Sequence, residues 1–304
     1  MDEPTEKERR EILPIFIMGL FFIVINGFAL VLSTIFLGAG MEVFENASDP
    51  TNLLILFGTI LVMTLIILLI AKFWKKRLIQ VIILFAVGYT SFYIFLPLLL
   101  LVLEGWTSSF LSILFAVLLV AALVKYPEWY VIDLCGIIIG AGAIALFGIS
   151  LSILLVIIFL IGLAIYDAIS VYKTKHMIDL ADTVMDLKLP VLLVVPKIRH
   201  YSIIKETKRL KEKLKEGEER DAFFMGLGDM VMPGILVVAA NSSITNGLPI
   251  ALSVLAGTLI GFLVLMTFVI KGKPQAGLPC LCGGAIIGYL LASLYFTGTI
   301  GLSL

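Results

Sequence analysis

The sequence is poor in charged residues for its length. Its 304 residues include only 22 Lys and Arg and 22 Asp and Glu, so the formal net charge is zero. Charged residues make up 14% of the chain, whereas soluble domains average about 25%, and this scarcity excludes a water-soluble globular domain as well as a disordered chain. The balance of charges also excludes a nucleic-acid-binding protein, which would carry a basic excess.

Histidine and cysteine are scarce as well, which limits metal and nucleophile chemistry. The only two histidines, His176 and His200, lie in a hydrophilic segment. A membrane-embedded His-Glu-x-x-His zinc site and a Ser–His dyad are therefore excluded. Cys135, Cys280 and Cys282 lie within or beside apolar stretches, and the Cys-x-Cys pair has no companion ligand nearby. We therefore expect no structural disulfide, no metal site and no cofactor.

Apolar residues are what the sequence has in excess, because they make up 61% of the chain and the mean hydropathy is +1.12. The apolar runs are continuous rather than alternating, which favours membrane helices over a β-barrel. A helical span needs about 20 apolar residues, and several runs reach or approach that length. We predict nine spans, at residues 12–38, 52–71, 78–103, 108–124, 130–147, 150–172, 222–240, 248–270 and 276–298.

The fold class predicted from these runs is an all-α polytopic membrane protein, with a single membrane domain over residues 1–304. Helices one to six occupy residues 12–172, a loop occupies 173–221, and helices seven to nine occupy 222–298. The break between helices five and six is placed at residues 147–150, because the apolar stretch around it is too long for one helix.

The basic residues decide the predicted orientation of the chain. With nine spans, all 22 Lys and Arg fall on the same side of the membrane as the N-terminus, and twelve of them lie in the 173–221 loop. Cytoplasmic loops carry the excess of Lys and Arg, so the N-terminus and this loop are predicted to be cytoplasmic and the C-terminus to lie outside. With eight or ten spans, the Lys and Arg residues would no longer all fall on one side of the membrane.

Three acidic residues lie in predicted spans: Asp133, Asp167 and Asp229. Each needs an explanation, because an ionised Asp at the bilayer centre costs at least about 2.5–3.5 kcal/mol. Asp133 lies in the first turn of the fifth predicted helix, where the helix dipole favours an acid, so we predict a structural role for it.

Asp167 and Asp229 are predicted to lie level with each other on consecutive antiparallel helices. Counting from Lys173 and Asp221 places them about 9 and 12 Å from the same face. Of two carboxylates that meet in a low-dielectric site, one keeps a proton and the other does not, which suits general acid–base hydrolysis of an amide. A proton- or cation-coupled transporter also uses intramembrane acids, so the two residues alone leave both functions open.

The residues around the two acids favour hydrolysis. Two glycines just before Asp229 leave a gap in the helix surface where a substrate backbone can approach. The hydroxyl of the tyrosine before Asp167 can hydrogen-bond near the site, and residues 273–279 form a helix start interrupted by Gly and Pro on the same predicted side. The predicted site-shaping residues are Tyr166, Gly226, Leu227, Gly228, Ala276, Gly277, Leu278 and Pro279.

The motifs Tyr166-Asp167, Gly-Leu-Gly-Asp at 226–229 and Ala-Gly-Leu-Pro at 276–279 resemble those of the presenilin and signal-peptide-peptidase family, the intramembrane aspartyl proteases of the GxGD type. The resemblance extends over the whole chain, because the nine spans, the cytoplasmic N-terminus and the loop between helices six and seven also match. The compact loops resemble those of archaeal presenilin homologues. Ala276 and Gly277 stand where the family's Pro-Ala-Leu motif has Pro and Ala.

This resemblance implies that Asp167 and Asp229 are catalytic and that the substrates are transmembrane segments of proteins, cleaved within the lipid bilayer of the cell membrane. We expect no obligate partner subunit, although the family contains members that need partners and members that act alone. An acid-dependent ion or solute transporter, or a leak channel, is the alternative function.

In this family the substrate unwinds near the cleavage site and can pair as a strand with the enzyme backbone. The valine-rich segment 189–196 is a candidate partner strand, and a loop plug or an interfacial anchor is the alternative for it. Glycine pairs four residues apart, Gly136 with Gly140 and Gly257 with Gly261, predict close helix packing.

Overall fold

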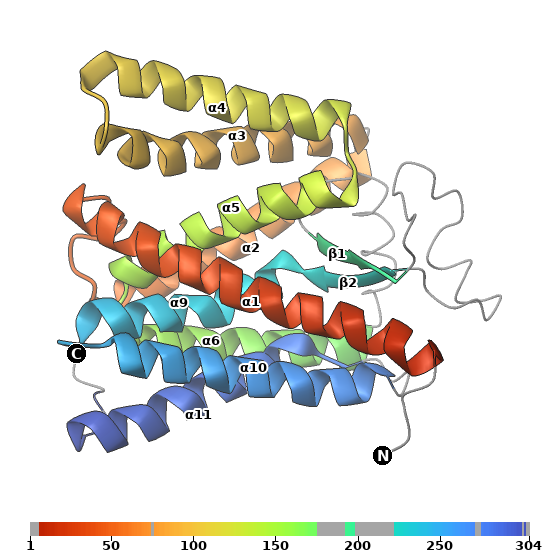
Figure 1. Ribbon diagram of the computed structural model, residues 1–304, viewed down its shortest axis with the longest axis vertical. Coiled ribbons are helices and arrows are strands. Elements are labelled where there is room, and N and C mark those ends of the chain that lie inside the picture. Colours follow the sequence, from red (N-terminus) through yellow and green to blue (C-terminus); the bar gives the residue numbers. More distant parts are fainter. Residues whose placement is uncertain are drawn as a thin grey trace.

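The structure, a computed structural model, describes residues 6–73, 76–174, 192–197, 222–270, 275–299 and 301. Within this part the chain forms a bundle of nine α-helices with one π-helical turn and a two-stranded sheet near one end (Figure 1). The elements are α1 (Glu6–Gly38), α2 (Thr51–Phe73), α3 (Lys76–Leu100), α4 (Gly105–Lys125), α5 (Trp129–Ser150), α6 (Ile153–Ile169), the π-helix η1 (Ser170–Thr174), β1 (Leu192–Pro196), β2 (Ala222–Gly226), α9 (Leu227–Ser243), α10 (Leu248–Ile270) and α11 (Gly277–Thr297).

The helices follow the predicted apolar runs. Seven helices of the described chain are long and apolar enough to cross a membrane, and two further apolar stretches, Thr51–Ile66 and Leu227–Ser243, are shorter. The multi-pass helical membrane protein expected from the composition is therefore confirmed. The expected all-α class is incomplete, because the structure also contains the sheet of β1 and β2.

The break between α5 and α6 lies slightly later than the predicted 147–150. Helix α5 continues to Ser150, and α6 begins after Ser152. The Val43 N–H donates a hydrogen bond to the Ser150 hydroxyl over 2.8 Å, and the Ser152 N–H donates to the Ala47 carbonyl over 2.9 Å. The connection between α1 and α2 thus helps to define where this break lies. Because these contacts join distant parts of the chain, no local sequence signal could reveal them.

Strand β1 pairs with β2 in an antiparallel register that sets Val194 opposite Phe224 and Val195 opposite Phe223. The prediction that residues 222–226 begin the seventh helix is wrong, since they form β2 and α9 begins at Leu227. Cross-strand pairs of aromatic and β-branched residues stabilise a sheet, and here they favour a strand over a helix at residues 222–226. The predicted strand is present at 192–196, and residues 189–191 lie outside the described chain.

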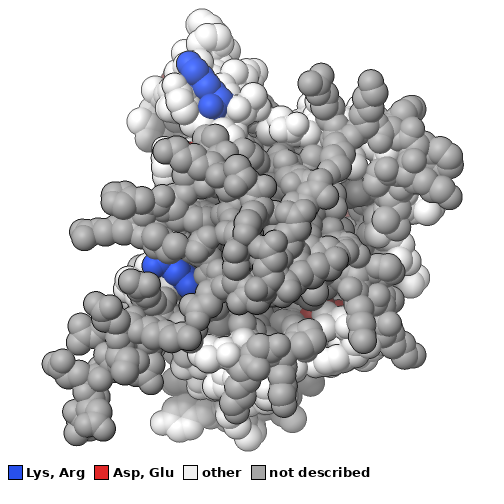
Figure 2. Space-filling model, turned by 90° about the vertical axis from the view of Figure 1, so that its right-hand side faces the viewer, with Lys and Arg blue, Asp and Glu red and all other residues white. Residues whose placement is uncertain are grey.

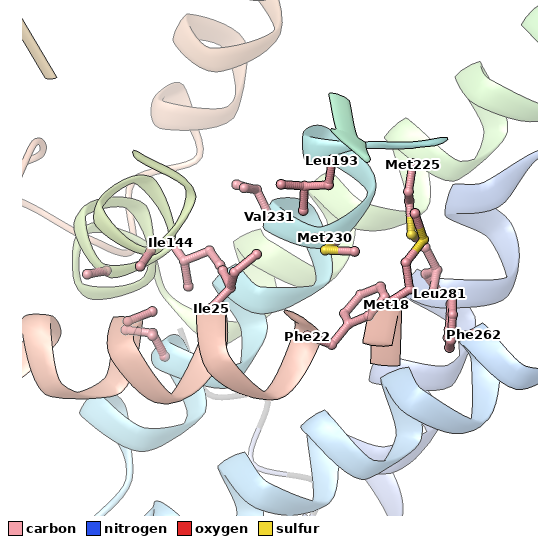
Figure 3. Packing of buried hydrophobic residues seen from close by; sticks show 14 of the residues in the cluster. Met18, Phe22, Ile25, Ile144, Leu193, Met225, Met230, Val231, Phe262 and Leu281 are labelled. Carbon is pink, nitrogen blue, oxygen red and sulfur yellow. The ribbon is translucent and has the colours of Figure 1, made fainter. Parts of the chain in front are cut away.

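The sheet is covered on both faces, as its alternating side chains show. Leu193 and Met225 pack in a cluster with residues of α1, α9, α10 and α11, and Figure 3 shows both within it. Val194 and Ala222 pack on the other side with residues of α3, α4 and α5. A strand that is buried on both faces is apolar along its whole length, so β2 looks like part of a membrane span in the sequence.

Helix α9 lies at the centre of the bundle. Nearly every residue from Met230 to Ala240 is buried, and the helix packs against α1, α5, α6, α10 and α11. Figure 3 shows Met230 and Val231 of α9 near the start of this helix, within the cluster that α1 and α11 also line. A helix that is apolar all round is buried, and α9 therefore holds the residues of its first turn inside the protein.

Helices α10 and α11 make the closest helix pair, through glycines. A Cβ on Gly257 would overlap the carbonyl oxygen of Gly284, and a Cβ on Gly261 would overlap the carbonyl oxygen of Cys280. The close packing predicted for the Gly257/Gly261 pair is confirmed. At the other predicted pair, Gly136 and Gly140, α5 instead receives side chains from β1 and α9.

Substitutions at two adjacent glycines in α11 test the close glycine contact between α10 and α11, called the seam below. Gly284→Ala places a Cβ onto the Gly257 carbonyl, so we expect the free energy of unfolding to fall by about 1–3 kcal/mol. Gly283→Ala is the matched control, because a Cβ there would meet no atom of another described element within 4 Å. Thermal unfolding of both variants in detergent measures the difference, and equal melting temperatures would contradict the seam.

Candidate active site

Asp167 and Asp229, which the sequence places on different helices, both contact the first turn of α11. The Leu278 N–H donates a hydrogen bond to Asp167 Oδ2 over 3.1 Å. A Cβ built on the neighbouring Gly277 would lie 3.1 Å from Asp229 Oδ2. The two carboxylates are also close enough to interact electrostatically. The structure therefore brings the two predicted acids together, against two consecutive residues of a third helix.

Asp167 lies in the last turn of α6, immediately before the π-helical turn η1. The C-terminal end of a helix disfavours an acid, because the helix dipole is negative there. The N-terminus of α11 offsets this penalty, since the backbone N–H groups of Leu278 and Gly277 both face the Asp167 carboxylate. These N–H groups have no partner within their own helix, so the carboxylate satisfies them.

Asp229 is the third residue of α9, in the turn where the helix dipole favours an acid. Glycine lies against its carboxylate on two sides. A Cβ on Gly226, the N-cap of α9, would lie 3.4 Å from Asp229 Oδ2, and a Cβ on Gly277 would lie 3.1 Å from the same oxygen. Missing side chains at both positions let two backbone segments close on one carboxylate.

The depth calculated for Asp229 from the sequence is wrong in its premise. It assumed helix from Asp221 onward, at 1.5 Å per residue. Residues 222–226 are a strand instead, and a strand rises by about 3.3 Å per residue. The two acids meet because both face α11, rather than because they are equally many helical residues from the same surface.

The surface at Gly228, the residue before Asp229, is open. A Cβ built on Gly228 would meet no atom of another element within 4 Å in the described part of the chain, and this residue is exposed. Asp167 and Asp229 are each intermediate between buried and exposed. Leu227, by contrast, points away into the notch at Gly140 of α5, where its Cδ1 would lie 3.1 Å from an added Cβ.

The remaining predicted site residues have distinct places around this opening. Tyr166 is 60% exposed, and its hydroxyl makes no hydrogen bond to another residue of the described chain. Ala276 is buried and is the N-cap of α11. Pro279 is the third residue of α11, where the missing N–H costs no bond within the helix.

Two residues have surroundings that the sequence did not predict. Cys282 lies one turn beyond Leu278 in α11, is fully buried and is close enough to both aspartates to interact with them electrostatically. Its spacing of four from Leu278 was a usable signal. Asp133 accepts a hydrogen bond from the Val194 N–H over 2.8 Å, a partner that helix-dipole reasoning could not supply.

The chemistry of this arrangement is that of a carboxylate pair. No group of three or more His, Cys, Asp or Glu residues in the described ranges is placed to hold a metal ion. When one carboxylate is ionised and the other protonated, the first can take a proton from water and the second can donate one to a carbonyl oxygen. The pair therefore suits hydrolysis of a peptide bond by an attacking water.

Comparisons with known proteins agree with this chemistry. The chain matches the family described as signal-peptide peptidase, presenilin aspartyl protease, over residues 18–298. Two solved structures of a presenilin family intramembrane aspartate protease, in the C222 and P2 space groups, are 36% identical to it, with TM-scores of 0.68 and 0.70. Each alignment covers 93% of this chain and 98% of the other. Among the curated proteins compared, none matches.

A family match over nearly the whole chain, a shared fold and a pair of membrane acids against one helix end lead to a single conclusion. This chain belongs to the signal-peptide peptidase and presenilin family, and it is an intramembrane aspartyl protease.

Proposed function

We propose that Asp167 and Asp229 are the catalytic pair and that they hydrolyse peptide bonds within transmembrane helices of substrate proteins. The single observation that carries the assignment is the contact of both carboxylates with Gly277 and Leu278. Asp133, the third acid in a predicted span, makes its hydrogen bond to a strand instead.

The proposed mechanism uses the two acids in turn. The ionised carboxylate takes a proton from a water molecule that enters through the opening beside Gly228, and the water attacks the peptide carbonyl. The protonated carboxylate donates its proton to the carbonyl oxygen as the tetrahedral intermediate forms. As the C–N bond breaks, the carboxyl that gained the proton of water gives it to the leaving amine, and the other carboxylate takes a proton back from a hydroxyl of the intermediate. Because the carboxylates interact, their protons titrate as a pair.

The substrate must be unwound, because amides inside a helix are hydrogen-bonded and shielded. Strand β2 offers the edge on which an unwound segment can lie. The Val194 N–H points to Asp133 and away from β2, so the Val194–Phe224 pair is of the non-hydrogen-bonded kind. The Phe224 N–H and C=O consequently point away from β1, along an edge that leads directly to Asp229. We therefore propose β2, in place of the segment 189–196 suggested by the sequence, as the strand that pairs with the substrate.

We further infer that the end of the bundle with the β1–β2 pair, called the hairpin below, is cytoplasmic and that nine spans put the C-terminus outside. Lys125 ends α4 and Lys197 follows β1, and the described Lys and Arg side chains that Figure 2 shows in blue lie on this end. The connection between α1 and α2 carries the acids Glu42, Glu45 and Asp49. This distribution follows the positive-inside rule for a protein of the cell membrane.

The protein is proposed to work as a single membrane domain, without cofactor or obligate partner subunit, on transmembrane peptides that reach it through the lipid. The alternative of an acid-dependent transporter or leak channel has no support from the family match. Uptake into proteoliposomes that needs both aspartates, without cleavage of any peptide, would be the result that favours it.

The first prediction concerns the catalytic pair. Asp167→Asn and Asp229→Asn keep the shape of the side chain and lose the acid–base function, so we expect cleavage of a transmembrane peptide to fall by at least about 100-fold. Mass spectrometry of the peptide products in detergent measures the loss, and circular dichroism checks that the helices remain. Full activity in either variant would contradict the assignment of Asp167 and Asp229 as the catalytic pair.

A second prediction concerns the fit around Asp229. Gly277→Val puts a branched side chain against Asp229 Oδ2, where even a Cβ would lie at 3.1 Å, so the carboxylate must move. We expect kcat to fall by at least about 10-fold, since small displacements of catalytic groups are costly. Gly283→Val, on the open side of the same helix, is the matched control and should keep the wild-type kcat.

A third prediction concerns the edge of β2. Phe224→Pro removes the N–H that points away from β1 and spares the ladder bonds to β1, so we expect KM for a transmembrane peptide to rise by about 3- to 10-fold. Phe224→Ala keeps the N–H and loses the side chain, and its KM should change less. An equal rise in both variants would assign the effect to the phenyl ring and contradict strand pairing.

A further inference from the structure

The third membrane acid, Asp133, has less surface exposed than either member of the catalytic pair. Its side chain is 3% exposed, and Asp133 Oδ1 accepts the Val194 N–H over 2.8 Å. Asp133 Oδ2 is also buried and has no hydrogen-bond partner among the described residues. A buried carboxylate that is only half satisfied is a cost to the fold, so its presence needs a specific reason.

The bond of Asp133 fastens β1 to α5 at a defined register. One residue before Val194, the Leu193 side chain enters the notch at Gly136, where a Cβ would lie 3.0 Å from Leu193 Cδ2. Gly136 follows Asp133 by three residues, which places both on one face of α5. The polar and apolar contacts thus dock adjacent residues of the strand on adjacent turns of the helix, and Figure 1 shows β1 beside the start of α5.

The position of β1 affects the position of Asp229, because β1 pairs with β2 and β2 leads into the helix that carries Asp229. Strand β1 pairs with β2 along all five residues, from Leu192 opposite Gly226 to Pro196 opposite Ala222. Gly226 is also the N-cap of α9 and lies against the Asp229 carboxylate. Asp133 on α5 is therefore connected to Asp229 through β1, β2 and the N-cap of α9.

The same bond closes one edge of the sheet. Val194 has its outward N–H occupied by Asp133, and Pro196 has no N–H at all. An unpaired strand edge is a template for a further strand, and β1 has lost most of its donors for one. An unwound substrate is left with the edge of β2, which runs to Asp229.

We propose that Asp133 is a positioning residue, which clamps β1 to α5, directs the substrate strand to β2 and holds the first turn of α9 in register with α11. Its link to catalysis rests on the proposed function of Asp167 and Asp229. Asp133 touches neither the reacting atoms nor the substrate, and it acts through Val194 and the hairpin.

The experiment compares Asp133→Leu, which keeps the volume and removes the acceptor, with Asp133→Asn, which keeps an accepting oxygen. Asp49→Ala is the matched control, because Asp49 Oδ1 also accepts one backbone N–H, that of Thr51, over 2.8 Å and lies outside the hairpin. All are full-length proteins in detergent. Amide hydrogen exchange of residues 192–197 and 222–226 and the kcat/KM for a transmembrane peptide are measured in parallel.

For Asp133→Leu we expect exchange in both strands to be at least about 10-fold faster and kcat/KM at least about 10-fold lower. Asp133→Asn should restore both values to within about 3-fold of the wild type, and Asp49→Ala should change neither. If Asp133→Leu does not fold, Val194→Pro removes the same bond from the strand side and spares the ladder to β2, with the same expected result.

Unchanged exchange in the hairpin of Asp133→Leu would overturn the clamp. Faster exchange with wild-type kcat/KM would overturn its link to catalysis, and so would an equal loss of activity in Asp49→Ala. A wild-type protein that cleaves no transmembrane peptide would count against the proposed function alone, because hydrogen exchange still decides whether Asp133 holds the hairpin.

Discussion

The first turn of α11 is the point on which the active site depends. Its free N–H groups face the Asp167 carboxylate at the negative end of α6, and the backbone of Gly277 closes on the Asp229 carboxylate. Two acids from different helices are thereby held against one short backbone segment. The close glycine contacts with α10, which begin at Gly261 against Cys280 one turn beyond Gly277, help to fix where the start of α11 lies and so the geometry of the two acids. Oriented dipoles of this kind stabilise charge without having to reorganise during a reaction.

A two-stranded sheet in a helical membrane protein requires an explanation, since unpaired backbone groups in lipid are costly. Here β1 and β2 satisfy each other, the Val194 N–H is taken by Asp133, and both faces are covered by helices. In the proposed substrate complex, the outward groups of Phe224 are the ones left for a substrate. A peptide that has given up its own helical hydrogen bonds would recover some of them there, which would lower the free-energy cost of unwinding.

Proteolysis inside a membrane needs water, an extended substrate and a pair of groups that can exchange protons. In the proposed mechanism, the opening beside Gly228, the edge of β2 and the Asp167–Asp229 pair supply these three requirements. A transporter would need the acids and a path across the membrane, but it would have no use for a strand edge that ends at one of them. The family match and the geometry therefore agree on hydrolysis.

Local properties of the sequence determined much of this protein. Apolarity and run length predicted the helices, the few acids in predicted spans together with the motifs around them singled out Asp167 and Asp229, and a four-residue glycine spacing predicted close packing at Gly257 and Gly261. Tertiary contacts decided the rest. Residues 222–226 are a strand because β1 lies beside them, the break after Ser150 is secured by the α1–α2 connection, and Asp133 has a partner only because β1 docks on α5. Each of these features depends on a hydrogen bond between residues far apart in the chain, and no periodicity or composition encodes such a bond.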